Sequence, residues 1–287
     1  MTLRDLQSTF RSELKSLYPD EEINSLFYIL TEHYLKINRL QASIDRDMTL
    51  DKTQFGQLLN AFNRIKNGEP VQYIIGEVEF NGLNLIVNES VLVPRPETEE
   101  LVHWVIDHYK ESSFKPKYVV DIGTGSGCIA LSMAKAFPEA LVYALDKSAM
   151  ALEVANKNAK RNGLEIHLQH VDILSRDFNW SETSKLDLII SNPPYVRQQE
   201  KSKMSKNVLD YEPHQALFVS DSDPLIFYKA ITKFAVDNLS DNGLLYFEFN
   251  EYLGEEMERL LDDNRFETEI KSDLFGKERM LRAKRKK

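Results

Sequence analysis

Residues Val119–Gly127 read VVDIGTGSG, and this stretch decides the fold class. An apolar run ends here in a loop of alternating glycines, and a helical pattern follows. Glycine lets the backbone take conformations closed to other residues and lets a ligand approach closely. Because ligands of open α/β sheets bind at the carboxyl ends of the strands, the loop is a candidate binding site. A tight turn without a ligand is the alternative reading.

Short apolar runs alternate with helical patterns after Lys117. The runs are Tyr118–Ile122, Leu141–Leu145, Ile166–Val171, Leu186–Ile190 and Leu244–Phe249. The helical patterns occupy residues 127–137, 148–161, 224–239 and 251–263. The alternation predicts an α/β fold with a mainly parallel sheet covered by helices on both faces. Phe266–Leu274 and Arg279–Ala283 are expected to add an antiparallel edge pair, which makes seven strands.

The first 66 residues predict helices instead. Apolar residues recur there at helical spacing in three stripes: Leu3, Leu6, Phe10, Leu14 and Leu17; Ile23, Leu26, Phe27, Leu30, Tyr34 and Ile37; Phe55, Leu58, Leu59, Phe62 and Ile65. We expect a small helical domain over residues 1–70. Asn81-Gly82, between the apolar-rich runs Tyr73–Phe80 and Leu83–Val87, predicts a β-hairpin. Residues 71–93 would then link the helices to an α/β domain at 94–287, whose first helix of about four turns begins near Glu97.

Composition narrows the possible partners. The chain has 287 residues and a net charge of −9, whereas a surface that clamps phosphates needs excess Lys and Arg, so duplex nucleic acid is not expected. Cys128 is the single cysteine, which excludes an intramolecular disulfide and a cysteine-based metal site. The N-terminus lacks the apolar core of a signal peptide, and no window reaches the roughly 18 apolar residues of a membrane span. We expect a cytoplasmic protein and, by default, a monomer.

Acidic residues follow two further strands. Asp146 ends the run after the glycine loop, where a carboxylate can accept hydrogen bonds from a ribose diol or cap the next helix. Asp172 ends the third run with Ile173 beside it, an arrangement suited to an adenine amino group and ring, or to a plain loop. The loop and Asp146 suit either a dinucleotide or S-adenosylmethionine, so they do not choose the cofactor.

The discriminating motif is Ser191-Asn192-Pro193-Pro194-Tyr195, directly after the strand at 186–190. Two prolines end sheet pairing, remove two amide donors and fix φ at both positions. The rigid turn that remains offers the Asn192 side-chain oxygen and the Pro193 carbonyl as acceptors, and Tyr195 adds an aromatic face. Together they would hold both hydrogens of a planar NH2 group. A rigid turn without this role is the alternative.

This arrangement answers a chemical difficulty. An amide nitrogen is a poor nucleophile because its lone pair is delocalised, whereas a sulfonium methyl group is already activated. Acceptors that favour positive charge on the nitrogen, with in-line placement, lower the barrier without a strong base. We therefore expect no catalytic His or Cys and no metal, since the six histidines are dispersed along the chain.

Several motifs resemble one family. The glycine loop with Asn192-Pro193-Pro194-Tyr195 is similar to class I methyltransferases that modify amide or exocyclic nitrogens. Further pieces resemble the release factor glutamine methyltransferases, called HemK or PrmC, over about residues 64–282. These pieces are Pro70–Gly76, Pro94-Arg95-Pro96-Glu97-Thr98-Glu99, Tyr211-Glu212-Pro213 with Ala216-Leu217, and Asp273-Leu274-Phe275-Gly276 with Arg279.

The resemblance implies a Rossmann-like domain that binds S-adenosyl-L-methionine and releases S-adenosyl-L-homocysteine, and a helical domain that docks a peptide chain release factor. The substrate would be the glutamine side chain of the factor's Gly-Gly-Gln loop. The implied catalytic residues are Asn192, Pro193, Pro194 and Tyr195. The implied cofactor residues are Gly123, Thr124, Gly125, Ser126, Gly127, Asp146, Asp172, Ile173 and Asn192. Arg95 and Glu97 would form the pocket mouth, although Arg95 could simply pair with Glu97.

One position departs from the family pattern. The family usually has Glu-x-Gly after the fifth strand, whereas this chain has Glu248-Phe249-Asn250. Asn is the non-glycine residue most able to adopt positive φ, so we expect Asn250 to preserve the backbone there.

Three other functions compete with this interpretation. An adenine amino-group methyltransferase would suit Asn-Pro-Pro-Tyr equally well through a flipped base, but the acidic balance disfavours nucleic acid. A nicotinamide dehydrogenase would use the glycine loop and Asp146 but gives Asn-Pro-Pro-Tyr no task. A catalytically silent binding module is the third, and only an activity assay excludes it.

Overall fold

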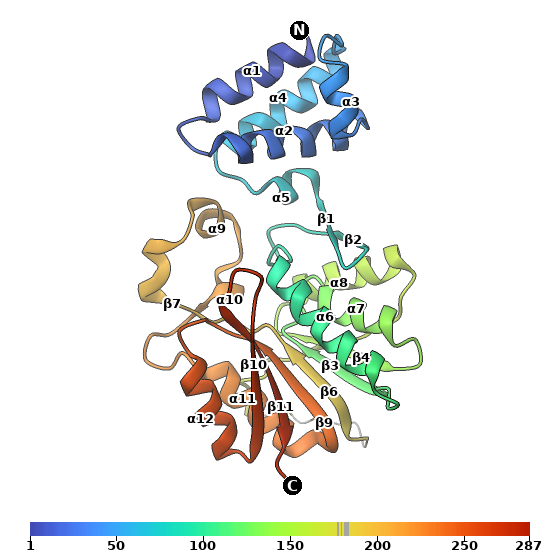
Figure 1. The fold of residues 1–287 in the computed structure, drawn as a ribbon, viewed down its shortest axis with the longest axis vertical. Coiled ribbons are helices and arrows are strands. Elements are labelled where there is room, and N and C mark those ends of the chain that lie inside the picture. Colours follow the sequence, from blue (N-terminus) through green and yellow to red (C-terminus); the bar gives the residue numbers. More distant parts are fainter. Residues whose placement is uncertain (177, 179, 181–183) are drawn as a thin grey trace. The chain divides into compact units, whose positions relative to one another are not determined.

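The computed structural model describes residues 1–176, 178, 180 and 184–287. The chain forms two compact units (Figure 1). One contains Met1–Gly76 and Ser205–Tyr211, and the other contains Glu77–Met204 and Glu212–Lys287. None of the helices within the described ranges is long and apolar enough to cross a membrane.

The smaller unit is helical. Its helices are α1 (Leu3–Leu14), α2 (Asp20–Leu35), α3 (Arg39–Ile44), α4 (Lys52–Lys66), α5 (Val71–Ile75) and α9 (Lys206–Tyr211). Thr2 and Asp51 begin α1 and α4 with capping boxes, in which a side chain accepts from the third helical amide. The predicted stripes meet in one core. Two residues were wrongly included in the stripes: Leu17 follows the end of α1 and is 54% exposed, and Leu59 lies in α4 but is 37% exposed and outside this core.

A hairpin opens the larger unit, and the prediction from Asn81-Gly82 is confirmed. Strands β1 (Glu77–Phe80) and β2 (Leu83–Ile86) pair antiparallel around these residues, whose φ angles are 49° and 65°. The expectation of a strand from Tyr73 was wrong, because residues 71–75 form the short helix α5. That helix begins after Pro70 and ends where Gly76 turns left-handed at φ 78°.

A mainly parallel seven-stranded sheet forms the centre of the larger unit, as predicted. Its order is β10-β11-β9-β6-β3-β4-β5. The strands are β3 (Tyr118–Ile122), β4 (Leu141–Asp146), β5 (His167–His170), β6 (Leu186–Ser191), β9 (Leu239–Glu248), β10 (Phe266–Ser272) and β11 (Glu278–Arg285). β11 pairs antiparallel with both β9 and β10, which confirms the predicted antiparallel pair at this edge.

Helices cover both faces of the sheet (Figure 1). Apolar side chains of α6 (Pro96–Glu111) and α7 (Cys128–Ala136) pack into one core, and those of α11 (Ile226–Asn238) and α12 (Gly254–Asp263) into the other. Helix α8 (Ala149–Asn162) packs beside β4 and β5. All five lie close to the predicted helical ranges. The layers leave the carboxyl ends of β3, β4, β5 and β6 at one edge.

Two features of this unit escaped prediction. Strand β9 begins at Leu239, five positions before the predicted start. Leu239 pairs with Leu186 and Leu244 pairs with Leu188, and the polar residues 240–243 lie in the strand between these pairs at a register shift. The region around residues 196–219 was not predicted at all. It contains β7 (Val196–Arg197), a 3-10 helix (Gln198–Lys203), α10 (His214–Leu217) and β8 (Phe218–Val219), besides α9 of the helical unit.

Candidate active site

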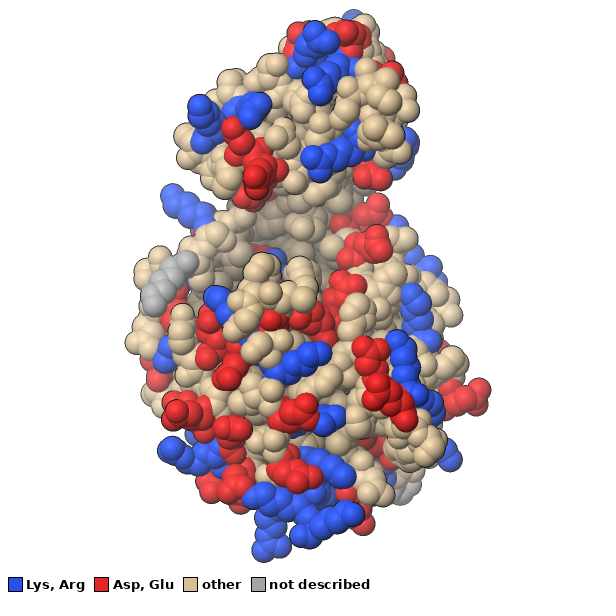
Figure 2. Space-filling model, viewed as in Figure 1, with Lys and Arg blue, Asp and Glu red and all other residues tan. Residues whose placement is uncertain are grey.

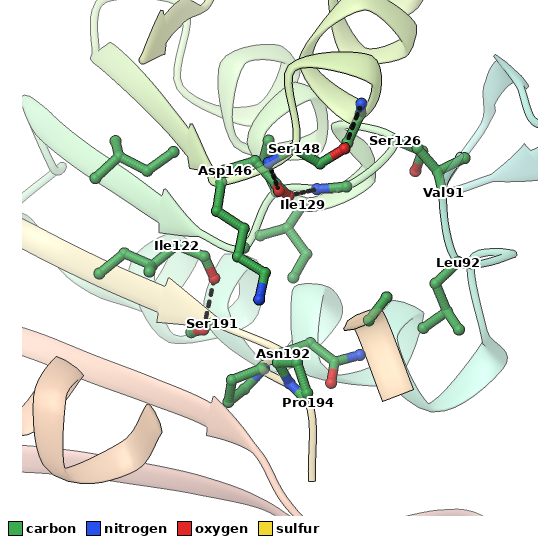
Figure 3. Close-up of a pocket in the computed structure, with 18 of the residues that line it drawn as sticks. Val91, Leu92, Ile122, Ser126, Ile129, Asp146, Ser148, Ser191, Asn192 and Pro194 are labelled. Atoms are coloured by element: carbon green, nitrogen blue, oxygen red, sulfur yellow. Dashed lines mark hydrogen bonds between the residues drawn. The ribbon is translucent and has the colours of Figure 1, made fainter. Parts of the chain in front are cut away.

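A cavity opens at the carboxyl edge of the parallel strands (Figure 3). It brings together most of the residues singled out in the sequence. Those on its wall are Arg95, Gly123, Thr124, Gly125, Ser126, Asp146, Asp172, Ile173, Asn192, Pro193 and Pro194. Gly127, Tyr195 and Glu97 do not line it. The glycine loop and the Asn-Pro-Pro turn, which lie about 70 positions apart, therefore share one cavity.

Hydrogen bonds beneath the glycine loop hold its shape. The amides of Gly123 and Thr124 donate to the Leu145 carbonyl at 2.8 and 2.9 Å. The Thr124 hydroxyl donates to Oδ2 of Asp121 at 2.6 Å, and the Ala130 amide donates to the same atom at 3.2 Å. Burial raises the pKa of Asp121 to about 7. Sequence reasoning did not assign Asp121 a role, although its place before Ile122-Gly123 was a usable signal. It supports the loop from below.

Gly127 has a packing role. Its φ is 83°, and a Cβ atom added there would lie 3.2 Å from the Cβ of Ala155 on α8. Glycine at this position therefore both turns the chain into α7 and lets α7 approach α8. Gly127 therefore contributes to packing and does not itself line the cavity.

Replacing Gly127 with alanine is expected to destabilise the protein by about 2 kcal/mol, because a left-handed non-glycine residue is strained and Ala155 must move. Urea unfolding measures the change. Gly56→Ala is the matched control: Gly56 lies within α4, and a Cβ atom there meets nothing within 4 Å. That substitution should stabilise by up to about 1 kcal/mol. A Gly127→Ala protein as stable as the wild type would contradict this role.

Asp146 stands at the end of β4 and faces the loop. Its Oδ2 accepts from the Gly125 amide and its Oδ1 from the Ser148 amide, each at 2.9 Å. Figure 3 shows both carboxylate oxygens engaged in this way at the cavity wall. Burial raises the pKa of Asp146 in spite of these hydrogen bonds. The carboxylate thus sets the loop and keeps remaining lone pairs for a ligand's hydroxyl groups.

Asp172 and Ile173 follow β5 on the same wall. Oδ1 of Asp172 accepts from the Leu174 amide at 2.9 Å, which turns the chain after the strand. Ile173 is partly buried against the core that α11 and α12 cover. The pair therefore offers a carboxylate and an apolar surface side by side.

The Asn-Pro-Pro turn begins where β6 ends. The Ser191 hydroxyl donates to the Ile122 carbonyl at 2.6 Å and so ties the end of β6 to the end of β3. Asn192 follows on the cavity wall, and its Nδ2 donates to Oγ1 of Thr98 at 3.0 Å. In Figure 3, Asn192 and Pro194 lie beside Ser191 at the end of this strand.

Tyr195 is engaged away from the cavity. Its hydroxyl donates to Oε1 of Glu248 at 3.0 Å, and its ring packs against the buried core. Burial raises the pKa of Tyr195 well above its ordinary value, so the phenol stays neutral. The structure thus does not bring its ring to the cavity wall, because the buried carboxylate of Glu248 draws the hydroxyl inward. Burial also raises the pKa of Glu248.

The expectation for Asn250 was wrong in its geometry. Lys36, Asn81 and Arg265 are the non-glycine residues with positive φ in the described chain, and Asn250 is not among them. Its side chain instead makes hydrogen bonds: Nδ2 donates to the Tyr195 carbonyl at 3.3 Å and to Oε2 of Glu200 at 3.1 Å. A glycine could make neither contact, so Asn250 fastens the segment after the Asn-Pro-Pro turn.

Arg95 pairs with a residue that the site prediction missed. Its guanidinium lies 2.5 Å from Oε1 of Glu212, whose side chain is 1% exposed, while Arg95 itself is 33% exposed. The other Glu212 oxygen accepts from the Val93 amide at 3.4 Å. The local pairing of Arg95 with Glu97 is therefore not found. The signal for Glu212 was its place in Tyr211-Glu212-Pro213, next to Pro213 on the cavity wall.

Cys128 and the side chains that could bind a metal ion were the remaining candidates for chemistry. Cys128 is buried, and burial raises its pKa to about 12, so it is a neutral thiol. Within the described ranges, no three His, Cys, Asp or Glu side chains are grouped to hold a metal ion.

Two protein-family models match separate parts of the chain. Residues 103–216 match the family model of the methyltransferase small domain, and residues 5–76 match that of the PrmC N-terminal domain. A 16S rRNA methyltransferase of T. thermophilus, solved with AdoMet and guanosine, has a TM-score of 0.52 at 17% identity, covering 73% of this chain and 50% of its own. At that identity the likeness concerns the fold alone.

Two relatives match along nearly the whole chain. A release factor glutamine methyltransferase of Flavobacterium psychrophilum is 46% identical over 99% of both chains. One of Bacteroides thetaiotaomicron is 39% identical over 96% of this chain and 97% of its own. Identity at this level over nearly whole chains settles the family. The chain belongs to the release factor glutamine methyltransferases.

Proposed function

We propose that this protein transfers a methyl group from S-adenosyl-L-methionine to the side-chain amide nitrogen of the glutamine in the Gly-Gly-Gln loop of peptide chain release factors. The observation that carries the proposal is the shared cavity of the glycine loop and Asn192-Pro193-Pro194. The names of the two relatives support the same substrate.

The cavity residues fit this cofactor. The glycine loop lies over the ends of β3 and β4, and a Cβ atom at Gly123 or Gly125 would meet nothing within 4 Å, so the loop backbone is open to a ligand. Asp146 presents a carboxylate to a ribose diol, and Asp172 with Ile173 presents an acceptor and an apolar surface to an adenine. When bound, the cofactor supplies a methyl group activated by the sulfonium charge.

The Asn-Pro-Pro turn fits the target amide. Nδ2 of Asn192 is used by Thr98, whereas no hydrogen bond among the described residues uses Oδ1 of Asn192 or the carbonyl of Pro193. Two acceptors on a proline-stiffened turn suit the two hydrogens of a carboxamide NH2. They orient the nitrogen and favour the positive charge that develops on it during transfer. Arg95, held by Glu212, lies on the same wall and would form the mouth of the pocket.

Mass spectrometry tests the proposal directly. Purified release factor incubated with this protein and S-adenosyl-L-methionine should gain one methyl group on the peptide that contains the Gly-Gly-Gln loop. A factor with glutamate in place of that glutamine is the matched control and should gain none. Methylation of DNA or RNA without methylation of the factor would favour an adenine amino-group methyltransferase instead.

Charge supports a protein substrate over duplex nucleic acid. The net charge is −9, and the face in Figure 2 carries acidic and basic side chains interspersed rather than in a continuous basic stripe. We also propose a cytoplasmic monomer, consistent with the release factor as substrate.

The helical unit is proposed to dock the body of the release factor. It matches a family model of its own and has a separate apolar core. Leu40 and Ile44 lie one turn apart on α3 and are 70% and 67% exposed. Apolar side chains exposed together in this way suit a contact with another protein.

The double substitution Leu40→Ser and Ile44→Ser is expected to raise KM for intact release factor several-fold. This increase corresponds to a loss of about 1 kcal/mol of binding free energy. The same protein should methylate a short Gly-Gly-Gln peptide as the wild type does, because the peptide reaches only the cavity. Exposed Leu141, on β4 of the other unit, provides the control Leu141→Ser, which should leave KM for the factor unchanged. An unchanged KM for intact factor in the double variant would exclude this surface.

A further inference from the structure

The hydroxyl of Thr98 lies between two side chains of the site. Thr98 is in the first turn of α6 and is 3% exposed, and Glu248, at the end of β9, is 1% exposed. Oγ1 of Thr98 lies 2.6 Å from Oε2 of Glu248 and 3.0 Å from Nδ2 of Asn192. Three elements distant in sequence thus meet at one hydroxyl group.

The single proton of that hydroxyl fixes the direction of both hydrogen bonds. A carboxylate can only accept, so Thr98 donates to Glu248, and the Tyr195 hydroxyl donates to the other carboxylate oxygen. Thr98 then has only lone pairs left for Asn192. The group that faces Thr98 must therefore be the NH2 of the Asn192 carboxamide, and the oxygen is left at its other end.

The orientation matters because the two ends of a carboxamide are nearly the same shape. Without a bias, Asn192 could rotate by half a turn and present NH2 to the NH2 of the target. Two donors repel, and the acceptor that favours charge on the target nitrogen would be lost.

We propose that Thr98 and Glu248 are positioning residues that hold the Asn192 carboxamide with its oxygen free for the target nitrogen. This inference rests on the proposed function, because it needs a substrate that donates hydrogens to Asn192. Thr98 lies on the cavity wall and Glu248 lies behind it, and the role proposed for both is exercised through Asn192.

Substitution at Thr98 separates this role from simple packing. Thr98→Val keeps the shape and removes the hydroxyl, and kcat for methylation of release factor should fall about tenfold, the factor that corresponds to about 1.4 kcal/mol. KM for the factor and affinity for S-adenosyl-L-homocysteine should stay within twofold. Thr98→Ser restores the hydroxyl and should restore most of kcat.

Thr232 provides the matched control. It is also fully buried, on α11, and its hydroxyl has no hydrogen-bond partner among the described residues. Thr232→Val should leave kcat unchanged and stabilise the protein slightly, since a buried unpaired hydroxyl is costly. If Thr98→Val and Thr232→Val have the same kcat as the wild type, the inference is overturned while the proposed function stands. A wild type without activity on the factor would overturn the proposed function instead.

A spectroscopic measurement tests the contact without any turnover. In protein labelled with 15N-asparagine, the side-chain signal of Asn192 is the one missing from Asn192→Ala. Its NH2 protons should exchange with water slowly in the wild type and in Thr98→Ser, and clearly faster in Thr98→Val. Equal exchange in all three proteins would overturn the inference.

The Glu248 end is tested by pH. Burial raises the pKa of Glu248, and the nearby Glu97 on α6 raises it further. Hydrogen bonds from the Thr98 and Tyr195 hydroxyls, and the charge of Arg279 on β11, lower this pKa. The Tyr228 hydroxyl from α11 donates only to the main-chain carbonyl of Glu248. If Glu248 were protonated, the Thr98 hydroxyl would no longer have to donate to it and could turn its hydrogen toward Asn192. Wild-type kcat should therefore fall as pH falls through this pKa, above the range of an ordinary glutamate, and Thr98→Val should lack that fall. The same acidic limb in both proteins would overturn the part assigned to Glu248.

Discussion

Asn192→Ala should lower methyl transfer to release factor by about a hundredfold to a thousandfold, the range found when one preorganised hydrogen-bonding group is removed from an active site. Affinity for S-adenosyl-L-homocysteine should stay within several-fold. The reason is that Oδ1 of Asn192 is the acceptor assigned to the target amide, whereas the glycine loop and Asp146 hold the cofactor. Single-turnover rates and calorimetric titration measure the two effects separately.

A second asparagine serves as the control for this substitution. Asn242 is exposed near the start of β9, away from the cavity, and Asn242→Ala should retain full activity. Loss of cofactor affinity in parallel with loss of transfer would mean that Asn192 mainly supports the cofactor site. Retained activity in Asn192→Ala would show that Oδ1 of Asn192 is not the acceptor for the target glutamine amide.

The fold could be predicted because the apolar patterns of both the strands and the longer helices are strong in this chain. The buried parallel strands are short apolar runs such as Leu186–Ile190, and the helices carry clear apolar faces. The start of β9 could not be predicted, since Asp241 and Asn242 are typical of a turn and lie in the strand between the paired residues Leu239 and Leu244. The short helices α3, α5, α9 and α10 have too few residues for a helical period to be recognised.

Residues of the cavity wall could be predicted where a motif follows directly after a strand. Asp146, Asn192 and the glycine loop were identified in this way, because parallel strands end at one edge of the sheet. Thr98, Glu212 and Glu248 were not assigned roles, since each acts through a partner more than 90 positions away in sequence. Tyr195 shows the converse: the motif named it, but a distant buried carboxylate decides where its hydroxyl points.

Asp146→Ala should weaken binding of S-adenosyl-L-homocysteine by about a hundredfold, because the Gly125 amide of the glycine loop and the Ser148 amide before α8 would each lose a hydrogen bond to a charged group, and the ligand would lose its own bonds to that carboxylate. Asp172→Ala is the matched comparison. Its carboxylate bonds one amide of its own turn and not the glycine loop, so the loss should be about tenfold or less. Equal losses in the two variants would contradict the special role of Asp146.

The pH dependence of binding follows from the same carboxylate. Burial raises the pKa of Asp146 above that of an ordinary aspartate. The ionised form is the one that accepts from both the loop and a ribose diol, so protonation competes with binding. Affinity for S-adenosyl-L-homocysteine should therefore be full above this pKa and decline as pH falls through it, at higher pH than an ordinary aspartate would produce. Calorimetric titration across acidic pH should give this decline in the wild type and a nearly flat affinity in Asp146→Ala. A wild-type affinity that stayed level across this range would show that the carboxylate of Asp146 does not bind the ribose.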